Sequence, residues 1–141
     1  MKHLREISVK VIPHSKQRYN TVGDYFKEMI YGIMPDKLPN SPNWICTERV
    51  MREQVRISSS NADYEFLIAM HELIEWYLTE KRGISEKSIT AFDKKFKGVE
   101  PGKDKKAPYH KEHMFAEKIE RMLAKELKVN WEKYDKELTE K

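Results

Sequence analysis

The chain has 141 residues, the length of one domain, with 39% hydrophobic residues, 35% charged residues and a net charge of +4. The single cysteine, Cys46, excludes an intramolecular disulfide, and the longest apolar run, Phe66 to Met70, is far shorter than the ~18 residues of a membrane span. We therefore expect one domain over residues 1–141 that does not cross a membrane. Because its first residues contain no apolar signal segment, we also expect a cytoplasmic location.

Residues 1–60 show the pattern of strands and loops. Apolar and polar residues alternate over 7–11 and again over 53–58, which predicts two short strands, and we expect them to pair antiparallel. Residues 21–30 are compatible with either a short helix or a turn. The proline-rich stretch 35–43 predicts a loop.

Residues 61–141 are predicted to be helical because apolar residues recur there at helical spacing and capping residues stand at the expected positions. The predicted helices run over 62–82, from Ser85 to Gly98, over 109–128, and from Asn130 onward. Together with the strands, this order predicts an α+β fold. A mostly helical bundle is the alternative.

Two of the predicted helices carry a His and a Glu four residues apart at the edge of their apolar face. One pair is His71 and Glu75, in an HExxE sequence, and the other is His113 and Glu117. Residues four apart lie side by side on a helix, so packing of the two apolar faces would bring four potential ligands together. His110, one turn before His113, is an alternate ligand.

Imidazole and carboxylate groups without a thiolate are ligands for Zn²⁺, and also for Mn²⁺ or Fe²⁺. An ion with an open coordination position lowers the pKa of a bound water toward ~7. Glu72 follows the first His and points away from the ligand pair, where a general base would lie. We therefore predict a divalent metal site, with zinc as the first choice, held by His71, Glu75 and His113 and also by Glu117 or His110.

The same residues are compatible with a buried polar network that holds no ion. His71 could donate to a backbone carbonyl, and Glu75 could pair with Arg82 or Lys118. Glu72 could be an ordinary solvated residue. The sequence leaves this alternative open.

A strand over 54–58 followed by a helix with His71 and Glu72 resembles the metal-binding core of zincin-type metallopeptidases. The resemblance implies a zincin-like architecture, a third ligand from further along the chain, and hydrolysis of peptide or amide bonds with Glu72 as the base. Glu75 stands where that family has its second His.

Five further stretches, 11–19, 21–25, 69–75, 107–116 and 130–131, are similar to a family of small bacteriophage and prophage proteins. This resemblance covers most of the chain. It implies a cluster of His and Glu residues and a location in the host cytoplasm, and it names no reaction.

Three functions follow as hypotheses: a metal-dependent hydrolase, a non-enzymatic phage accessory protein with a structural metal or a polar network, and a Mg²⁺-dependent nucleotide pyrophosphohydrolase. The third rests on the pairs Glu72/Glu75 and Glu117/Glu120, which resemble the carboxylate sites of those helical enzymes. The Lys-rich loop 94–111 leaves nucleic-acid binding open, although no recognition motif supports it. The substrate and the oligomeric state are not predicted.

Overall fold

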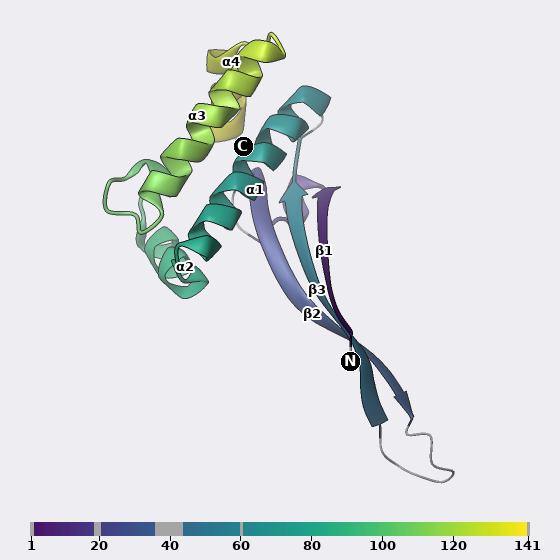
Figure 1. The fold of residues 1–141 in the computed structure, drawn as a ribbon. Coiled ribbons are helices and arrows are strands. Elements are labelled where there is room, and N and C mark those ends of the chain that lie inside the picture. The colour runs from purple at the N-terminus through teal and green to yellow at the C-terminus, as the bar shows by residue number, and fades with distance from the viewer. Residues whose placement is uncertain (1, 19–20, 36–43, 60, 141) are drawn as a thin grey trace.

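The structure is a computed structural model that describes residues 2–18, 21–35, 44–59 and 61–140. Strands precede helices, as the α+β prediction requires, and the predicted fold class is confirmed (Figure 1). Within the described ranges the elements are β1 (Lys2–Val11), the short 3₁₀ helix η1 (His14–Lys16), β2 (Gly23–Pro35), β3 (Trp44–Ile57), α1 (Ala62–Lys81), α2 (Glu86–Lys95), the 3₁₀ helix η2 (Pro101–Lys103), α3 (His110–Glu126) and α4 (Trp131–Thr139).

The three strands form one sheet in the order β1-β3-β2. β2 pairs antiparallel with β3, but β1 pairs parallel with β3, which corrects the expectation of short antiparallel strands. The strands are also longer than expected, with 10, 13 and 14 residues. The parallel pairing arises because β2 intervenes in the chain: β2 and β3 form an antiparallel pair, and β1 then joins the free side of β3. This sheet excludes the mostly helical alternative.

The short helix considered for residues 21–30 is wrong, because this segment belongs to β2. β2 pairs with β3 along almost the whole length of β3. The hydrogen bonds and side-chain packing of this ladder outweigh the weak local preference of residues 21–30 for a helix or a turn. The ribbon of β2 and β3 extends beyond the helices (Figure 1). Of the loop predicted over 35–43, residues 36–43 lie outside the described part of the chain, and Pro35 ends β2.

Three helices begin at capping side chains. Asn61, Ser85 and Asn130 each accept a hydrogen bond from the backbone N–H three residues further on, at the start of α1, α2 and α4, and the sequence marks Ser85 and Asn130 as caps. The sequence pattern for α1 instead favours a capping box of Ser60 and Asp63, and Ser60 lies outside the described residues. Gly83 follows α1 with a φ of +70°, a left-handed conformation that glycine adopts without strain.

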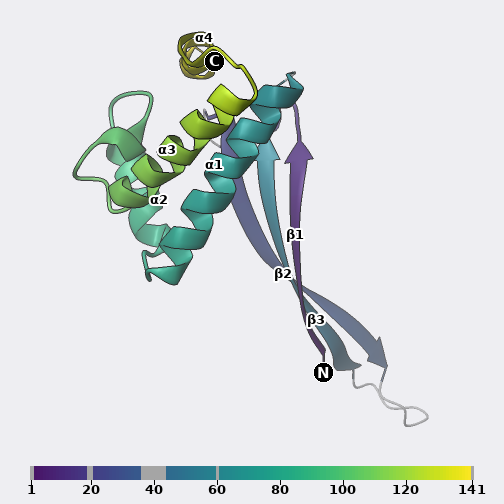
Figure 2. The ribbon, with the colours of Figure 1, turned by 45° about the horizontal axis from the view of Figure 1, so that its top comes forward.

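α1 lies between the sheet and α3 (Figures 1 and 2). Its burial therefore extends over two sides. Helical spacing alone places Phe66 and Tyr77 on one apolar arc of this helix and Trp76 on its polar side. In the structure Phe66 and Tyr77 are about half exposed, and Trp76 is buried against Tyr25 of β2. The apolar core joins β3, α1, α3 and α4, and Tyr134 of α4 is fully buried in it. No helix in the described part of the chain is both long and apolar enough to span a bilayer.

Candidate metal centre

Three side chains from α1 and α3 meet at one point. His71 Nε2 lies 3.0 Å from Glu75 Oε2 and 3.2 Å from His113 Nδ1, and His113 Nδ1 lies 2.8 Å from the same Glu75 oxygen. His71 and Glu75 are one turn apart on α1, while His113 reaches them from α3. Within 4.8 Å of one another, the three groups are placed to bind a metal ion, as the sequence predicted for them.

The spacing of these atoms is near that of a metal ligand set. Bonds of ~2.0–2.1 Å in a tetrahedral site separate the ligand atoms by ~3.3 Å. The three separations here are 2.8, 3.0 and 3.2 Å, distances that also suit direct hydrogen bonds, so an ion requires the ligands to move apart only slightly. Two imidazole nitrogens and one carboxylate oxygen are also the donors that zinc accepts. The donor set and its geometry therefore fit a divalent ion.

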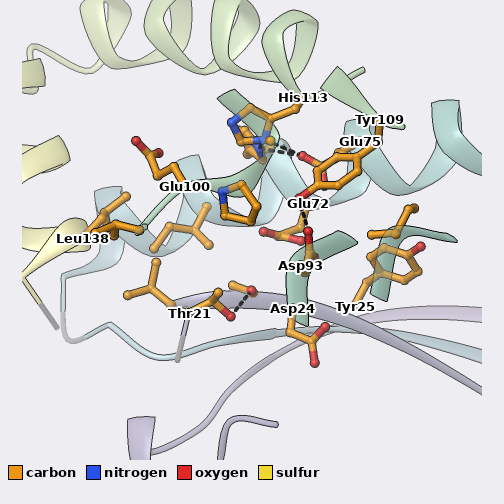
Figure 3. Close-up of a pocket in the computed structure, with 18 of the residues that line it drawn as sticks. Thr21, Asp24, Tyr25, Glu72, Glu75, Asp93, Glu100, Tyr109, His113 and Leu138 are labelled. Carbon is orange, nitrogen blue, oxygen red and sulfur yellow. Dashed lines mark hydrogen bonds and ion pairs between the residues drawn. The ribbon is translucent and has the colours of Figure 1, made fainter. Parts of the chain in front are cut away.

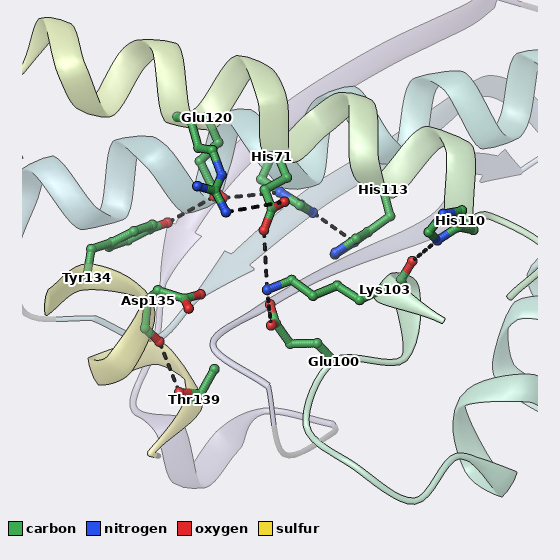
Figure 4. A network of polar contacts seen from close by, with 12 residues as sticks. His71, Glu100, Lys103, His110, His113, Glu120, Tyr134, Asp135 and Thr139 are labelled. Carbon is green, nitrogen blue, oxygen red and sulfur yellow. Dashed lines mark hydrogen bonds and ion pairs between the residues drawn. The ribbon is translucent and has the colours of Figure 1, made fainter. Parts of the chain in front are cut away.

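The His71 ring is oriented by residues behind it. Its Nδ1 lies 3.3 Å from Glu120 Oε1, and the Tyr134 hydroxyl donates a 3.2 Å hydrogen bond to Glu120 Oε2 (Figure 4). Burial and the Glu120 carboxylate raise the pKa of Tyr134, so its hydroxyl remains a donor. A carboxylate beside Nδ1 favours the tautomer whose Nε2 lone pair is free for an ion.

His113 is held by its surroundings in a different way. Gly102 of η2 lies against the imidazole so closely that a Cβ at this position would overlap the ring. The other ring nitrogen, Nε2, is buried and has no hydrogen-bond partner among the described residues. The position of this ring thus depends on a glycine in the loop before α3.

The charges of the cluster are strongly coupled. Burial alone would raise the pKa of Glu75, but hydrogen bonds from His113 and His71 outweigh it and lower the pKa to about 2. Burial opposes protonation of His71, yet Glu120 and Glu75 together raise its pKa well above the ordinary value. The site therefore holds an anionic carboxylate that attracts positive charge, whether from protons or from an ion.

Glu72 is not the ordinary solvated residue that the sequence left open as an alternative. It is half-buried and lines the cavity, and a Cβ built on Gly23 of β2 would lie only 2.7 Å from its Oε1 (Figure 3). Burial, with the nearby charge of Glu75, raises its pKa to about 8. The sheet covers this side of α1, which explains the difference from the expectation.

A cavity of about 420 Å³ opens beside the three ligands (Figure 3). Its walls come from β2, α1, α2, the loop before α3, and α4, and they combine apolar side chains such as Phe96 and Leu138 with carboxylates. Tyr109 closes part of it and donates a 2.7 Å hydrogen bond to Asp93. The carboxylates on the wall belong to Asp24, Glu72, Glu75, Glu86, Asp93, Glu100 and Glu120.

Two predicted ligands are not brought to the centre. Glu117 Oε1 lies 3.3 Å from Lys103 Nζ, and His110 Nδ1 donates a 2.9 Å hydrogen bond to the carbonyl of Gly102 (Figure 4). Of the five candidate ligands, the structure brings together His71, Glu75 and His113. The reason is the rotation of α3 about its axis: positions 113 and 120, seven residues apart, both face α1, and position 117 turns toward η2.

Sequence reasoning placed Glu120 at the border of the helix face that carries His113, and in a carboxylate pair, but gave it no role beside His71. The available signal was its spacing of seven residues, or two helical turns, from His113. The arrangement as a whole can bind a cation, orient one imidazole through a carboxylate, and present Glu72 to a cavity beside the ion position. Comparison with protein-family models, curated proteins and solved structures finds no match for this chain.

Proposed function

We propose that this protein is a divalent-metal-dependent hydrolase in which His71, Glu75 and His113 bind the ion and Glu72 activates water. One observation carries the proposal: three ligand atoms converge at the wall of a cavity that the Glu72 side chain also lines. Structural zinc sites are closed by four protein ligands, whereas catalytic sites have three and keep one position open. Two His and one Glu are one of the ligand sets of catalytic zinc.

The roles of the residues follow from their positions. A bound divalent ion supplies Lewis acidity and makes its water acidic. Glu72 adjoins His71 in sequence and faces the cavity, so its carboxylate is placed to accept the proton of a water that attacks the substrate. A cation in the site also favours the ionised form of Glu72, which is the form that a base requires.

Peptide and amide bonds are the substrates that we propose first. The sequence His71-Glu72 on a helix that follows a strand supports this choice. The apolar residues Phe96 and Leu138 give the cavity a surface for a side chain of the substrate.

A structural ion is the second candidate. The three ligands join α1 to α3, so an ion would also link these helices and contribute to folding. Chelation would then lower the melting temperature, and substitution of Glu72 would have no consequence for any reaction.

The first test is the metal content of tag-free protein purified without chelator, measured by inductively coupled plasma mass spectrometry. We expect about one Zn, Mn or Fe per chain, lost in the double variant His71→Ala/His113→Ala and retained in the matched control His110→Ala. Absence of stoichiometric metal after reconstitution with each ion would overturn the metal site.

Glu72→Gln separates the catalytic site from the structural one. We expect this variant to keep its metal and to lose hydrolysis of a mixed fluorogenic peptide library by about a hundredfold or more, the typical effect of a general base. Full turnover in Glu72→Gln would exclude Glu72 as the base. Bound metal without hydrolysis of any peptide or amide by the native chain would favour the structural ion.

A further inference from the structure

β1 exposes an apolar stripe at the open edge of the sheet. Ile7, Val9 and Val11 are 49%, 49% and 50% exposed. Val9 and Val11 are paired in register with Val55 and Ile57 of β3, both of which are buried in the core. The apolar face of the sheet therefore continues past the part that the helices cover and ends uncovered on β1.

The backbone of β1 is also open along this edge. Ile12 N–H donates a 2.7 Å hydrogen bond to the carbonyl of Ile57, so even-numbered residues of β1 turn their backbone groups toward β3. Odd-numbered residues turn theirs outward, and no strand in the described part of the chain pairs with that side of β1 (Figures 1 and 2). Exposed apolar edge strands with free backbone groups associate with other strands.

The sequence of β1 is complementary to itself in the antiparallel direction. Residues 6–10 are Glu-Ile-Ser-Val-Lys, so an antiparallel partner strand centred on Ser8 places Glu6 opposite Lys10 and Ile7 opposite Val9. The ion pairs would lie on the polar face of the sheet, and the Ile–Val pairs would lie on the apolar face. From this complementarity we infer that β1 pairs with β1 of a second copy of the chain, about a twofold axis at Ser8.

Neighbouring registers lack this complementarity. An axis at Val9 places Glu6 opposite Ile12 and Lys10 opposite Ser8. An axis at Ile7 places Lys10 opposite Leu4. Of these three axes, only the one at Ser8 forms opposite-charge pairs, and it forms two of them by symmetry. Opposite charges directly across two strands stabilise a pair, and like charges destabilise it.

The dimer would have one continuous sheet of six strands. A twofold axis perpendicular to the sheet places the helices of both copies on the same face. Ile7 and Val9 of the two copies then meet between the two α1 helices, which shields apolar surface that one chain leaves exposed, while Val11 lies opposite Arg5 of the second copy. This arrangement does not involve the metal ligands, so it stands independently of the proposed function.

Disulfide trapping tests the register. In the antiparallel ladder, Ser8 faces its own copy in a non-hydrogen-bonded pair with a Cα separation of ~4.5 Å, within the range that a disulfide spans. We expect Ser8→Cys, in a Cys46→Ser background, to form a covalent dimer under mild oxidation. Glu6→Cys alone should form no covalent dimer, whereas a mixture of Glu6→Cys and Lys10→Cys should form a covalent heterodimer. Cross-linking of Glu6→Cys with itself would overturn the register.

Charge exchange tests the interface without new covalent chemistry. Sedimentation equilibrium should show a dimer for the native chain. Lys10→Glu or Glu6→Lys alone should raise the dimer Kd by about tenfold, because two symmetric pairs become repulsive. The double variant Glu6→Lys/Lys10→Glu should restore the dimer Kd to within about threefold of the native value. Lys118→Glu, an exposed charge reversal on α3, is the matched control. A monomeric native chain at all accessible concentrations, or a double exchange as weak as the single ones, would overturn the dimer.

Discussion

His71 Nε2 and His113 Nδ1 lie 3.2 Å apart although 42 positions separate them in the chain. Their rings meet nearly edge to face, at an interplanar angle of 66°. At this distance one imidazole nitrogen can donate a proton to the other, but both cannot donate at once, so a second proton needs a different acceptor. Glu75 provides this acceptor, and a metal ion would replace the protons among all three groups.

Substitution of Glu120 tests its orientation of His71. Glu120→Gln weakens the acceptor beside Nδ1, so we expect metal affinity to fall by about 10- to 100-fold, the usual effect of such a change behind a ligand. Competition with a chromophoric chelator measures this affinity. Glu117→Gln, a matched carboxylate on the same helix, should change it little, and equal losses in the two variants would contradict the assignment.

Gly102→Ala should displace the third ligand. The added Cβ overlaps the His113 ring, so the imidazole must move out of the ligand group. We expect weaker metal binding in the same chelator competition, with an unchanged circular dichroism spectrum. The control is Lys105→Ala, an exposed position in the same loop. Native affinity in Gly102→Ala would show that His113 is not required.

Gly23→Ala should displace the Glu72 carboxylate. A Cβ at this position meets Glu72 Oε1 at 2.7 Å and Ile68 Cγ2 at 2.8 Å, and none of the three nearest atoms belongs to a ligand residue. On the proposed function, kcat falls while the metal content and KM stay near their native values. Loss of metal in this variant would instead show that Gly23 supports the ligand group.

Two adjacent residues of α1 test its packing. Leu67 is fully buried and Phe66 is 46% exposed, although the sequence placed both on the apolar arc. We expect Leu67→Ala to lower the free energy of unfolding by about 2–5 kcal/mol and Phe66→Ala to lower it by less than about 1 kcal/mol. Urea titration in chelator measures both. The reverse order would show that the helix is rotated from the position described.

The pH dependence of stability distinguishes a metal site from a polar network. In metal-free protein, the raised pKa of His71 contributes stability below about pH 6.5 that is lost as the pH rises through the raised value. The pKa of Glu75, about 2, contributes stability above about pH 4.5 that is lost as the pH falls through 2. Protons compete with zinc for the imidazole nitrogens, so the stability that zinc adds grows as the pH rises. With zinc bound, the loss of stability at alkaline pH should therefore be reversed. Parallel melting curves across pH with zinc and with chelator would contradict a metal site.

Local sequence determined the helices and the placement of two of the three ligands, His71 and Glu75, relative to each other. Side-chain caps mark where α1, α2 and α4 begin, and helical spacing places His71 and Glu75 one turn apart whatever surrounds them. His113 was predictable as a ligand because it stands at the edge of the apolar face of α3, and that face had to pack against another helix. These features depend on neighbours a few residues away.

Only the tertiary structure decided the remainder. The direction of β1 relative to β3 depends on pairing with a strand that is distant in the chain, and so does the inclusion of residues 23–30 in the sheet. The alternation of apolar and polar residues predicts a strand but does not predict its partner or its direction. The burial of Glu72 and Trp76 depends on the sheet that covers a second side of α1. The exchange of Glu117 for Glu120 beside His71 follows from a small rotation of α3. Helical periodicity places residues on a face, but the packing partner decides which members of that face reach the site.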